Sequence, residues 1–138
     1  MASAATGRLT LRILTPTREL VSTEADSVNL VAYEGEVGIL PGHAPYLAIV
    51  RPGIATVKDG ATSTRYALGD GFLEVRDDVM TVLVRAAEAQ GDVDTARAER
   101  RLAECEEKLK RTDLSEDERA AAEQSREKQA ARLALAGR

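Results

Sequence analysis

One histidine, His43, and one cysteine, Cys105, are the side chains in this sequence best suited to acid–base or nucleophilic chemistry. His43 lies in a segment rich in glycine and proline, and Cys105 lies in a highly charged stretch without metal-ligand spacing. The carboxylates are scattered, and no glycine-rich phosphate loop of the usual kind accompanies them. The sequence therefore predicts a protein that is not an enzyme by itself, binds no metal and requires no cofactor.

Composition argues against two classes of partner. The net charge is -4 and aromatic residues make up 3% of the 138 residues, so neither electrostatic attraction nor base stacking favours nucleic acid. No segment approaches the roughly 20 apolar residues of a membrane span, and Met1 to Gly7 lacks the cationic start and apolar run of a signal peptide. We expect a soluble protein from a reducing compartment, without direct membrane insertion, that can attach to a membrane complex.

The composition of the chain changes near Gly91, which indicates a change in the elements that position these side chains. All prolines and aromatic residues lie before it, whereas the stretch from Asp94 to Arg138 is rich in charge and contains a single glycine, Gly137. Such a shift indicates two parts with different secondary structure. We predict a first domain over residues 1–88 and a second over residues 89–138.

The first part is predicted to be an antiparallel β-sandwich. Leu9, Leu11 and Ile13 alternate with polar residues, as half-buried strands do. Asp59-Gly60 separates two further strand segments and suits a tight hairpin turn, because this dipeptide tolerates positive φ. Met80 to Val84 is apolar or β-branched at every position, which predicts a strand buried on both faces or paired at the centre of the sandwich.

The second part is predicted to be an antiparallel hairpin of two helices, which makes the chain an α+β protein. Asp92 and Asp94 are placed to accept hydrogen bonds from the free amides at the start of a first helix, which runs from about Asp94 to Arg111. Ser115 and Glu118 form a capping-box sequence at the start of a second helix. The first helix carries a narrow apolar stripe, made of Ala98, Leu102, Cys105 and Leu109.

The second helix has few residues to bury. Its buried face offers little beyond Ala121, Ala131 and Leu135, or after a small rotation Ala130 and Leu133. At roughly 1.5 to 3 kcal/mol for each fully buried leucine, docking of this helix contributes only a few kcal/mol before entropy is subtracted. We therefore expect a helix that can detach.

One segment carries a family resemblance. Gly35 to Pro45 is predicted to be a rigid corner between two strands that displays Glu36 and His43, and its ordinary interpretation is a plain strand connection. The run Gly-Glu-Val-Gly-Ile-Leu-Pro-Gly-His-Ala-Pro nevertheless closely resembles a loop of the ATP synthase epsilon subunit, which is called delta in mitochondria. Further segments resemble the same family in order: Leu11 to Pro16, Arg51-Pro52-Gly53, Gly69 to Val75, Val79 to Val84 and Asp92 to Ala98.

The resemblance implies a non-catalytic rotor subunit in the central stalk of the F-type proton-translocating ATP synthase. In this family the sandwich meets the gamma subunit and the ring of membrane c-subunits, and so couples them to ATP synthesis in the catalytic head. The hairpin switches between a folded form on the sandwich and an extended form that reaches the alpha and beta subunits and inhibits ATP hydrolysis. The implied location is peripheral, at the cytoplasmic face of the bacterial inner (cell) membrane, in keeping with the absence of an Arg-rich transit peptide.

The resemblance also implies sites for these contacts. The contacts with stalk and ring fall on Glu36, Gly38, Pro41, Gly42, His43, Ala44 and Pro45. For His43 a second explanation is open, namely a structural histidine bonded to nearby backbone. The inhibitory contacts fall on cations of the second helix: Arg119, Arg126, Lys128 and Arg132. Acidic residues are interspersed among them, so a solvated surface is the alternative for each cation.

Some members of the family bind regulatory ATP on the folded hairpin. The matching residues here are Glu88, Val93, Asp94, Arg97, Ala98 and Arg126. The alternative is structural: Asp94 caps the first helix, and Arg97 pairs with a neighbouring carboxylate. A different function class also stays open, a β-sandwich adaptor whose hairpin forms a coiled coil with another partner through a strong heptad seam.

Overall fold

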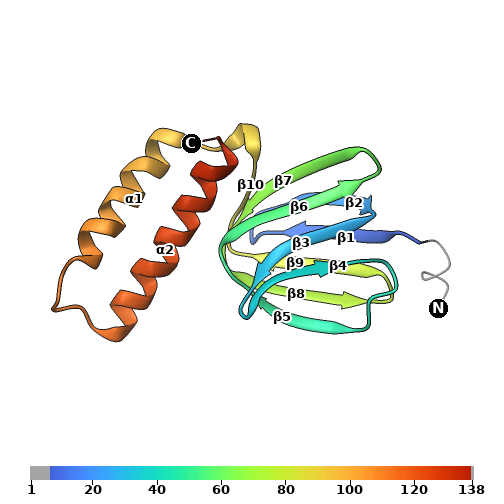
Figure 1. The fold of residues 1–138 in the computed structure, drawn as a ribbon, viewed down its shortest axis with the longest axis horizontal. Helices are drawn as coiled ribbons and strands as arrows, with labels where there is room; N and C mark the ends of the chain where they lie inside the picture. Colours follow the sequence, from blue (N-terminus) through green and yellow to red (C-terminus); the bar gives the residue numbers. More distant parts are fainter. Residues whose placement is uncertain (1–6, 138) are drawn as a thin grey trace.

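The computed structural model describes residues 7–137. Met1 to Thr6 and Arg138 lie outside the described residues, and so does most of the segment for which no targeting signal is predicted. Strands come first along the chain and helices last (Figure 1). The strands are β1 (Leu9–Leu14), β2 (Glu19–Ala25), β3 (Ser27–Ala32), β4 (Gly35–Ile39), β5 (Tyr46–Val50), β6 (Gly53–Asp59), β7 (Thr62–Leu68), β8 (Gly71–Arg76), β9 (Val79–Val84) and β10 (Ala87–Ala89). A 3-10 turn, η2 (Gln90–Asp92), leads to the helices α1 (Thr95–Leu109) and α2 (Glu116–Leu135).

The strands form a sandwich whose two layers share one core. One layer runs β10-β7-β6-β3, with β4 also paired to β3, and the other runs β5-β8-β9-β1-β2. The two layers are joined where β3 pairs with β5, at Ala32 and Val50. Neighbouring strands are antiparallel except β1 and β9, which are parallel. The predicted α+β fold with an antiparallel sandwich is confirmed, apart from that parallel pair. The predicted division at residues 88 and 89 lies in β10, where the chain passes from strands to helices, and stays a prediction.

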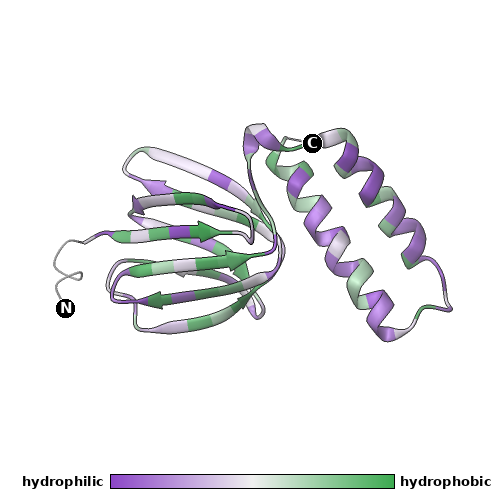
Figure 2. Cartoon of the chain, turned by 180° about the vertical axis from the view of Figure 1, so that it is seen from behind, coloured by the Kyte–Doolittle hydropathy of each residue, from purple (hydrophilic) through white to green (hydrophobic). Residues whose placement is uncertain are grey.

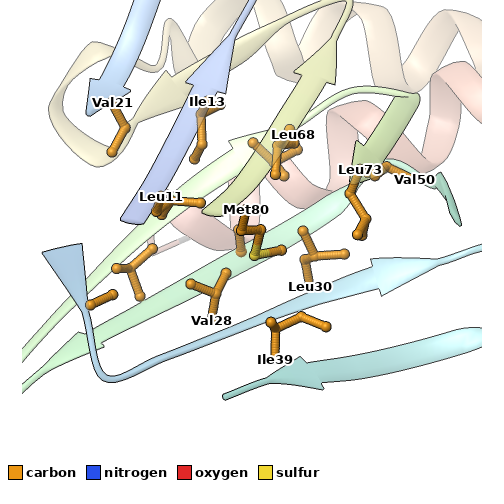
Figure 3. Close-up of a cluster of buried hydrophobic side chains, with 14 of the residues drawn as sticks. Leu11, Ile13, Val21, Val28, Leu30, Ile39, Val50, Leu68, Leu73 and Met80 are labelled. Carbon is orange, nitrogen blue, oxygen red and sulfur yellow. The ribbon is translucent and has the colours of Figure 1, made fainter. Parts of the chain in front are cut away.

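Alternating side chains meet between the layers. Leu9, Leu11 and Ile13 are buried while Thr10 and Arg12 are exposed, as the sequence pattern predicts. Figure 3 shows the cluster that these side chains join; its labelled members are Leu11, Ile13, Val21, Val28, Leu30, Ile39, Val50, Leu68, Leu73 and Met80. Each fully buried aliphatic side chain contributes about 1.5–3 kcal/mol relative to exposure, so this cluster is the main source of the sandwich's stability.

Strands β6 and β7 form the predicted tight hairpin. Asp59 pairs with Thr62, and Gly60 adopts a φ of 60° in the turn. The Asp26 carboxylate accepts a hydrogen bond from the Gly60 amide at 2.5 Å. The turn is therefore fixed both by its own sequence and by the β2–β3 connection.

The segment Gly35 to Pro45 differs from the predicted rigid corner. Its first half is strand β4, in which Glu36 pairs with Val31 of β3. The physical reason is that Val37 and Ile39 alternate with exposed residues and pack inward, which outweighs the low strand preference of the glycines. The turn is confined to residues 40–45, hereafter the 40–45 loop.

Strand β9 lies between β8 and β1, as predicted for a central strand, but it is buried on one face. Met80 and Val82 point into the core, whereas Leu83 is 54% exposed. The prediction of burial on both faces is wrong for the described chain, because none of residues 7–137 covers the outer side of Leu83.

Helix α1 begins and packs as predicted. Asp94 is its N-cap, and Asp94 Oδ1 accepts a hydrogen bond from the Arg97 amide at 3.1 Å. Ala98 is fully buried, and the other stripe residues, Leu102, Cys105 and Leu109, are half-buried. The predicted capping box also forms, since Ser115 Oγ accepts from the Glu118 amide at 3.1 Å and Glu118 Oε1 accepts from the Ser115 amide at 2.9 Å.

Helix α2 lies between α1 and the sandwich, where it contacts β6 and β7 (Figure 1). Both helices are largely hydrophilic, with sparse apolar positions (Figure 2). The buried residues of α2 are Ala122, Gln129, Ala131, Leu133 and Leu135. The prediction is correct for the last three and wrong for Ala121 and Ala130, which are exposed. The prediction assumed one buried face, but a helix between two neighbours buries two. Leu133 and Leu135 point about 160° apart around the helix axis.

Gly71 begins β8 where this strand passes very close to β9. A Cβ at Gly71 would lie 1.9 Å from the Leu83 carbonyl oxygen, a clash that only backbone displacement relieves. We predict that Gly71→Ala lowers the free energy of unfolding in urea by about 1–3 kcal/mol or more. Gly91→Ala is the control, because a Cβ there meets nothing within 4 Å, and it is expected to stay within about 0.5 kcal/mol. Equal effects of the two substitutions would contradict the close approach.

Candidate functional site

The 40–45 loop is a tight turn at the end of the sandwich opposite the helices (Figure 1). The His43 amide donates to the Leu40 carbonyl at 3.2 Å, and Gly42 has a φ of 84°. With Pro41 before it, this is a type II turn, which needs a residue tolerant of positive φ at its third position. The loop therefore has one preferred backbone shape, and Leu40 at its start is exposed.

His43 is half-buried in this loop and has local partners. Its Nδ1 lies 2.7 Å from the Ala44 carbonyl oxygen; because a carbonyl only accepts, Nδ1 carries the proton. Its ring also lies against Tyr46, with centroids 5.5 Å apart. The structure therefore supplies the backbone bond of the structural alternative, and a direct contact with a partner stays a prediction.

The predicted interface residues do not all lie together. Pro41, Gly42, His43, Ala44 and Pro45 share the 40–45 loop, whereas Glu36 and Gly38 lie on the exposed face of β4. Along a strand that rises about 3.3 Å per residue, Glu36 is about 13 Å from Leu40. Glu36 thus lies toward the other end of its strand, away from the loop.

An apolar row crosses the outer face of the β5-β8-β9 layer. Ile49 lies directly opposite Phe72, Phe72 lies opposite Leu83, and Leu83 in turn lies beside Leu14 of β1. Phe72 is 56% exposed, and Ile49 and Leu83 are more than half exposed as well. Leu47 and Tyr33 extend this surface, hereafter the outer apolar face.

The outer apolar face is hollowed on both sides of Ile49 and Phe72. A hollow of about 450 Å³ has Leu14, Pro16 and Leu83 among its lining residues, and one of about 400 Å³ has Tyr33 and Leu47. Ile49 and Phe72 line both. A row of exposed apolar side chains beside concavities is a mark of an interaction surface.

The sequence analysis missed this surface, although the signal was present. Met80 to Val84 is apolar or β-branched without interruption, and this pattern predicts either burial on both faces or a place at the centre of the sandwich. A strand that is apolar on both faces also fits a sheet whose second face is covered by another protein. Nothing in a single sequence separates these two cases.

Two ion pairs fasten α2 to the sandwich. The Arg132 Nε donates to Glu88 Oε1 at 2.5 Å and its Nη2 donates to Glu88 Oε2 at 3.1 Å, while Nη1 donates to Gln129 at 2.8 Å. This bidentate pair is well shielded, since the Arg132 side chain is 11% exposed. Arg51, in the connection between the layers, pairs with Glu127 at 2.5 Å in a more exposed position.

The four predicted inhibitory cations therefore differ in this folded form. Arg132 is engaged by Glu88, and Arg119 donates to the carbonyls of Leu109 and Arg111 at the end of α1. Arg126 is exposed and Lys128 is half-buried, and neither side chain makes an ion pair within residues 7–137. Half of the set is therefore engaged in the folded form, Arg132 with the sandwich and Arg119 with the end of α1.

The predicted nucleotide residues are also partly engaged. The Glu88 carboxylate is held by Arg132 and the Asp94 carboxylate by the Arg97 amide, as in the structural alternative for Asp94. Val93 and Ala98 flank the start of α1, and the Arg97 and Arg126 side chains have no ion pair in the described part of the chain. The pairing of Arg97 with a neighbouring carboxylate is thus not found there. ATP binding stays a prediction.

The turn between the helices holds three groups with shifted pKa values. The hydrogen bond from the Ser115 amide lowers the pKa of Glu118 from its ordinary 4.5. The side-chain hydrogen bond between Arg111 and Asp113 lowers the pKa of Asp113 and raises that of Arg111. In residues 7–137 no group of three or more His, Cys, Asp or Glu is arranged to hold a metal ion, and none of the helices there has the length and apolarity to cross a membrane.

Comparison with known proteins decides the family. A family model described as the β-sandwich domain of the ATP synthase delta/epsilon chain matches residues 8–90. The chain belongs to this family. An ATP synthase epsilon chain from Anaeromyxobacter sp. (strain Fw109-5) is 39% identical over 131 residues, which cover 94% of this chain and 98% of the relative. That from Myxococcus xanthus (strain DK1622) is 36% identical over 130 residues, which cover 94% and 95%.

Solved structures agree on the fold of this delta/epsilon family member. A chain in the Euglena gracilis mitochondrial ATP synthase, in a structure of OSCP, F1 and c-ring, matches with a TM-score of 0.78 at 22% identity, over 96% of this chain and 82% of that one. A chain in the central stalk and c-ring of the Tetrahymena thermophila enzyme matches with a TM-score of 0.66 at 12% identity, over 93% and 96%. The resemblance found in the sequence is confirmed, and with it the assignment as a non-catalytic subunit of ATP synthase.

Removing the charge of Glu88 is expected to loosen α2. Glu88→Gln keeps the shape of the side chain but leaves the shielded Arg132 guanidinium without its counter-charge. We predict that the free energy of opening of α2, measured by native-state hydrogen exchange, falls by about 1–3 kcal/mol. Glu19→Gln removes a more exposed pair with Arg12, between β1 and β2, and should leave α2 exchange unchanged. Unchanged α2 exchange in Glu88→Gln would contradict the role of this pair.

The start of α2 is expected to be sensitive to acid. Because the pKa of Glu118 is lowered in the folded helix, its contribution is fully present above 4.5 and is lost as the pH falls below that value. We predict that the helical NMR shifts of residues 115–118 decrease over this range. Glu118→Gln retains an acceptor oxygen without the charge and should lose this part of the pH dependence; an unchanged profile in the variant would assign the effect to other groups.

Proposed function

We propose that this chain is a rotor subunit of the central stalk in a bacterial F-type, proton-translocating ATP synthase. Its sandwich binds the gamma subunit and the ring of c-subunits, and its helical hairpin restrains ATP hydrolysis by reaching the alpha and beta subunits. It acts as a peripheral subunit at the cytoplasmic face of the cell membrane. The observation that carries the proposal is the outer apolar face on a chain of the delta/epsilon family.

The outer apolar face supports a permanent partner rather than a transient one. Phe72, Ile49 and Leu83 are held side by side by sheet hydrogen bonds, so their exposure is built into the fold. Burial of apolar surface contributes about 25 cal/mol per Å², and water contact at these positions is therefore unfavourable until a partner covers them. We assign this face to the gamma subunit.

The 40–45 loop lies at the opposite end of the sandwich from the hairpin (Figure 1). A rotor subunit between the catalytic head and the membrane ring needs two such ends. We assign the loop, with the exposed Leu40 and the predicted residues Pro41 to Pro45, to the ring. Glu36 and Gly38 on β4 lie outside the loop, and Glu36 lies toward the other end of the strand, so we do not assign them to the contact between the loop and the ring.

The hairpin fits a switch because its attachment is modest. Extension breaks the Glu88–Arg132 and Arg51–Glu127 pairs and exposes Leu133 and Leu135. The same extension releases Arg132 to join Arg126 and Lys128 as cations that face an acidic partner surface. Arg132 therefore cannot pair with Glu88 in the folded form and contact the acidic partner surface in the extended form at the same time.

Truncation tests the assignment of the two parts. We predict that the full chain binds a catalytic head that lacks this subunit and slows its ATP hydrolysis, whereas a chain that ends at Gly91 binds without slowing it. A urea transition of the truncated chain verifies that its sandwich is folded. Failure of the full chain to bind would exclude the stalk assignment, and equal inhibition by both chains would exclude a brake in the hairpin.

A substitution on the outer apolar face tests the gamma contact separately. Phe72 points away from the core, so we expect Phe72→Gln to leave the stability of the free chain nearly unchanged. Loss of one buried aromatic side chain, about 1.5–3 kcal/mol, corresponds to a 10- to 100-fold weaker affinity for the gamma subunit. Thr64→Gln on exposed β7 is the control and should bind normally. Normal binding by Phe72→Gln would place the gamma contact elsewhere.

A further inference from the structure

The amide of Gly42 needs an acceptor from outside its own turn. In a type II turn the hydrogen bond runs from the fourth residue to the first, here from His43 to Leu40, and the amide of the third residue points outward. Gly42 occupies that third position with a φ of 84°. Because this amide has no acceptor within the turn, the source of its acceptor determines how firmly the loop is held.

That acceptor is Asp78, which is distant in sequence and buried. The Gly42 amide donates to Asp78 Oδ1 at 2.6 Å across 36 positions of the chain. Asp78 is 4% exposed, although aspartate is rarely buried this far without a charged partner. Within residues 7–137 its second oxygen, Oδ2, has no hydrogen-bond partner. Among the described residues, the hydrogen bond from the Gly42 amide is therefore the polar contact that compensates for the burial of the Asp78 carboxylate.

The backbone around Asp78 is fixed as well. Asp77 and Asp78 form the turn between β8 and β9, with φ values of 50° and 61° that match a type I′ hairpin. The Asp78 carbonyl oxygen accepts a hydrogen bond from the Thr10 amide at 2.8 Å, which ties this turn to β1. The carboxylate thus projects from a rigid support toward the loop.

We propose that Asp78 is the positioning residue of the 40–45 loop: its carboxylate holds the Gly42 amide and presents Leu40 and His43 to the ring in one geometry. This inference rests on the proposed contact between the loop and the ring. A loop that is already ordered loses less conformational entropy on binding, so the contact with the ring depends on a residue that does not touch it.

Three variants of the full chain distinguish the effect of the Asp78 carboxylate from that of the turn's backbone conformation. Asp78→Gly removes the acceptor while glycine accommodates the positive φ, and Asp78→Asn retains an acceptor oxygen with a residue that also suits this turn. Asp77→Gly is the matched control, since Asp77 is exposed in the same turn with a similar φ. Amide hydrogen exchange of Gly42 is measured in each free chain, together with affinity for a purified complex of gamma subunit and c-ring.

We expect Asp78→Gly to raise Gly42 exchange and to weaken binding to the complex at least tenfold each. Asp78→Asn should keep the Gly42 exchange rate and the affinity within about threefold of the values for the parent chain. Asp77→Gly should resemble the parent chain in both. Unchanged Gly42 exchange in Asp78→Gly, absence of rescue by Asp78→Asn, or normal binding by a chain with a loosened loop would each overturn the inference. Failure of the parent chain to bind the complex would instead overturn the proposed function, and the exchange data would still decide the bond to Gly42.

Discussion

The packing of the two strand layers against each other is the interaction on which the rest of the molecule depends. Leu11, Leu73 and Met80 from one layer meet Val28, Leu30 and Ile39 from the other (Figure 3). That core fixes the plane of β8 and β9, and the plane decides which side chains face outward. The outer apolar face, the 40–45 loop and the platform for α2 are all consequences of one buried cluster.

The two ends of the sandwich are stabilised by different interactions, namely hydrogen bonds to turns at one end and ion pairs to α2 at the other. At the end away from the helices, short turns are tied by hydrogen bonds from backbone amides to carboxylates that are distant in the sequence, such as those from Gly42 to Asp78 and from Gly60 to Asp26. At the other end, α2 is held by two ion pairs and a few apolar residues on two of its faces. A firmly tied end and an end held by a few contacts fit the anchoring and regulatory roles proposed for this chain.

The sequence contains most of the local structure. Alternation of Leu9, Leu11 and Ile13, the turn at Asp59-Gly60 and the caps at Asp94 and Ser115 are short-range patterns, and each formed as predicted. The contacts that matter most for the candidate site are long-range. Gly42 with Asp78 and Glu88 with Arg132 depend on how distant elements pack, which no spacing within one sequence reveals. The exposure of Leu83 and its neighbours on the outer apolar face was not predicted, because the same apolar residues suit a core and a surface that a partner covers.

The central claim, that the sandwich is covered on one outer face by the stalk and at one end by the ring, is tested most directly by hydrogen exchange of the full chain alone and in an assembled complex with gamma subunit and c-ring. The account predicts added protection along β5, β8 and β9 and in residues 40–45, with little change in the hairpin formed by β6 and β7. Protection confined to β6, β7 and β10, or none in the β5-β8-β9 layer, would contradict it.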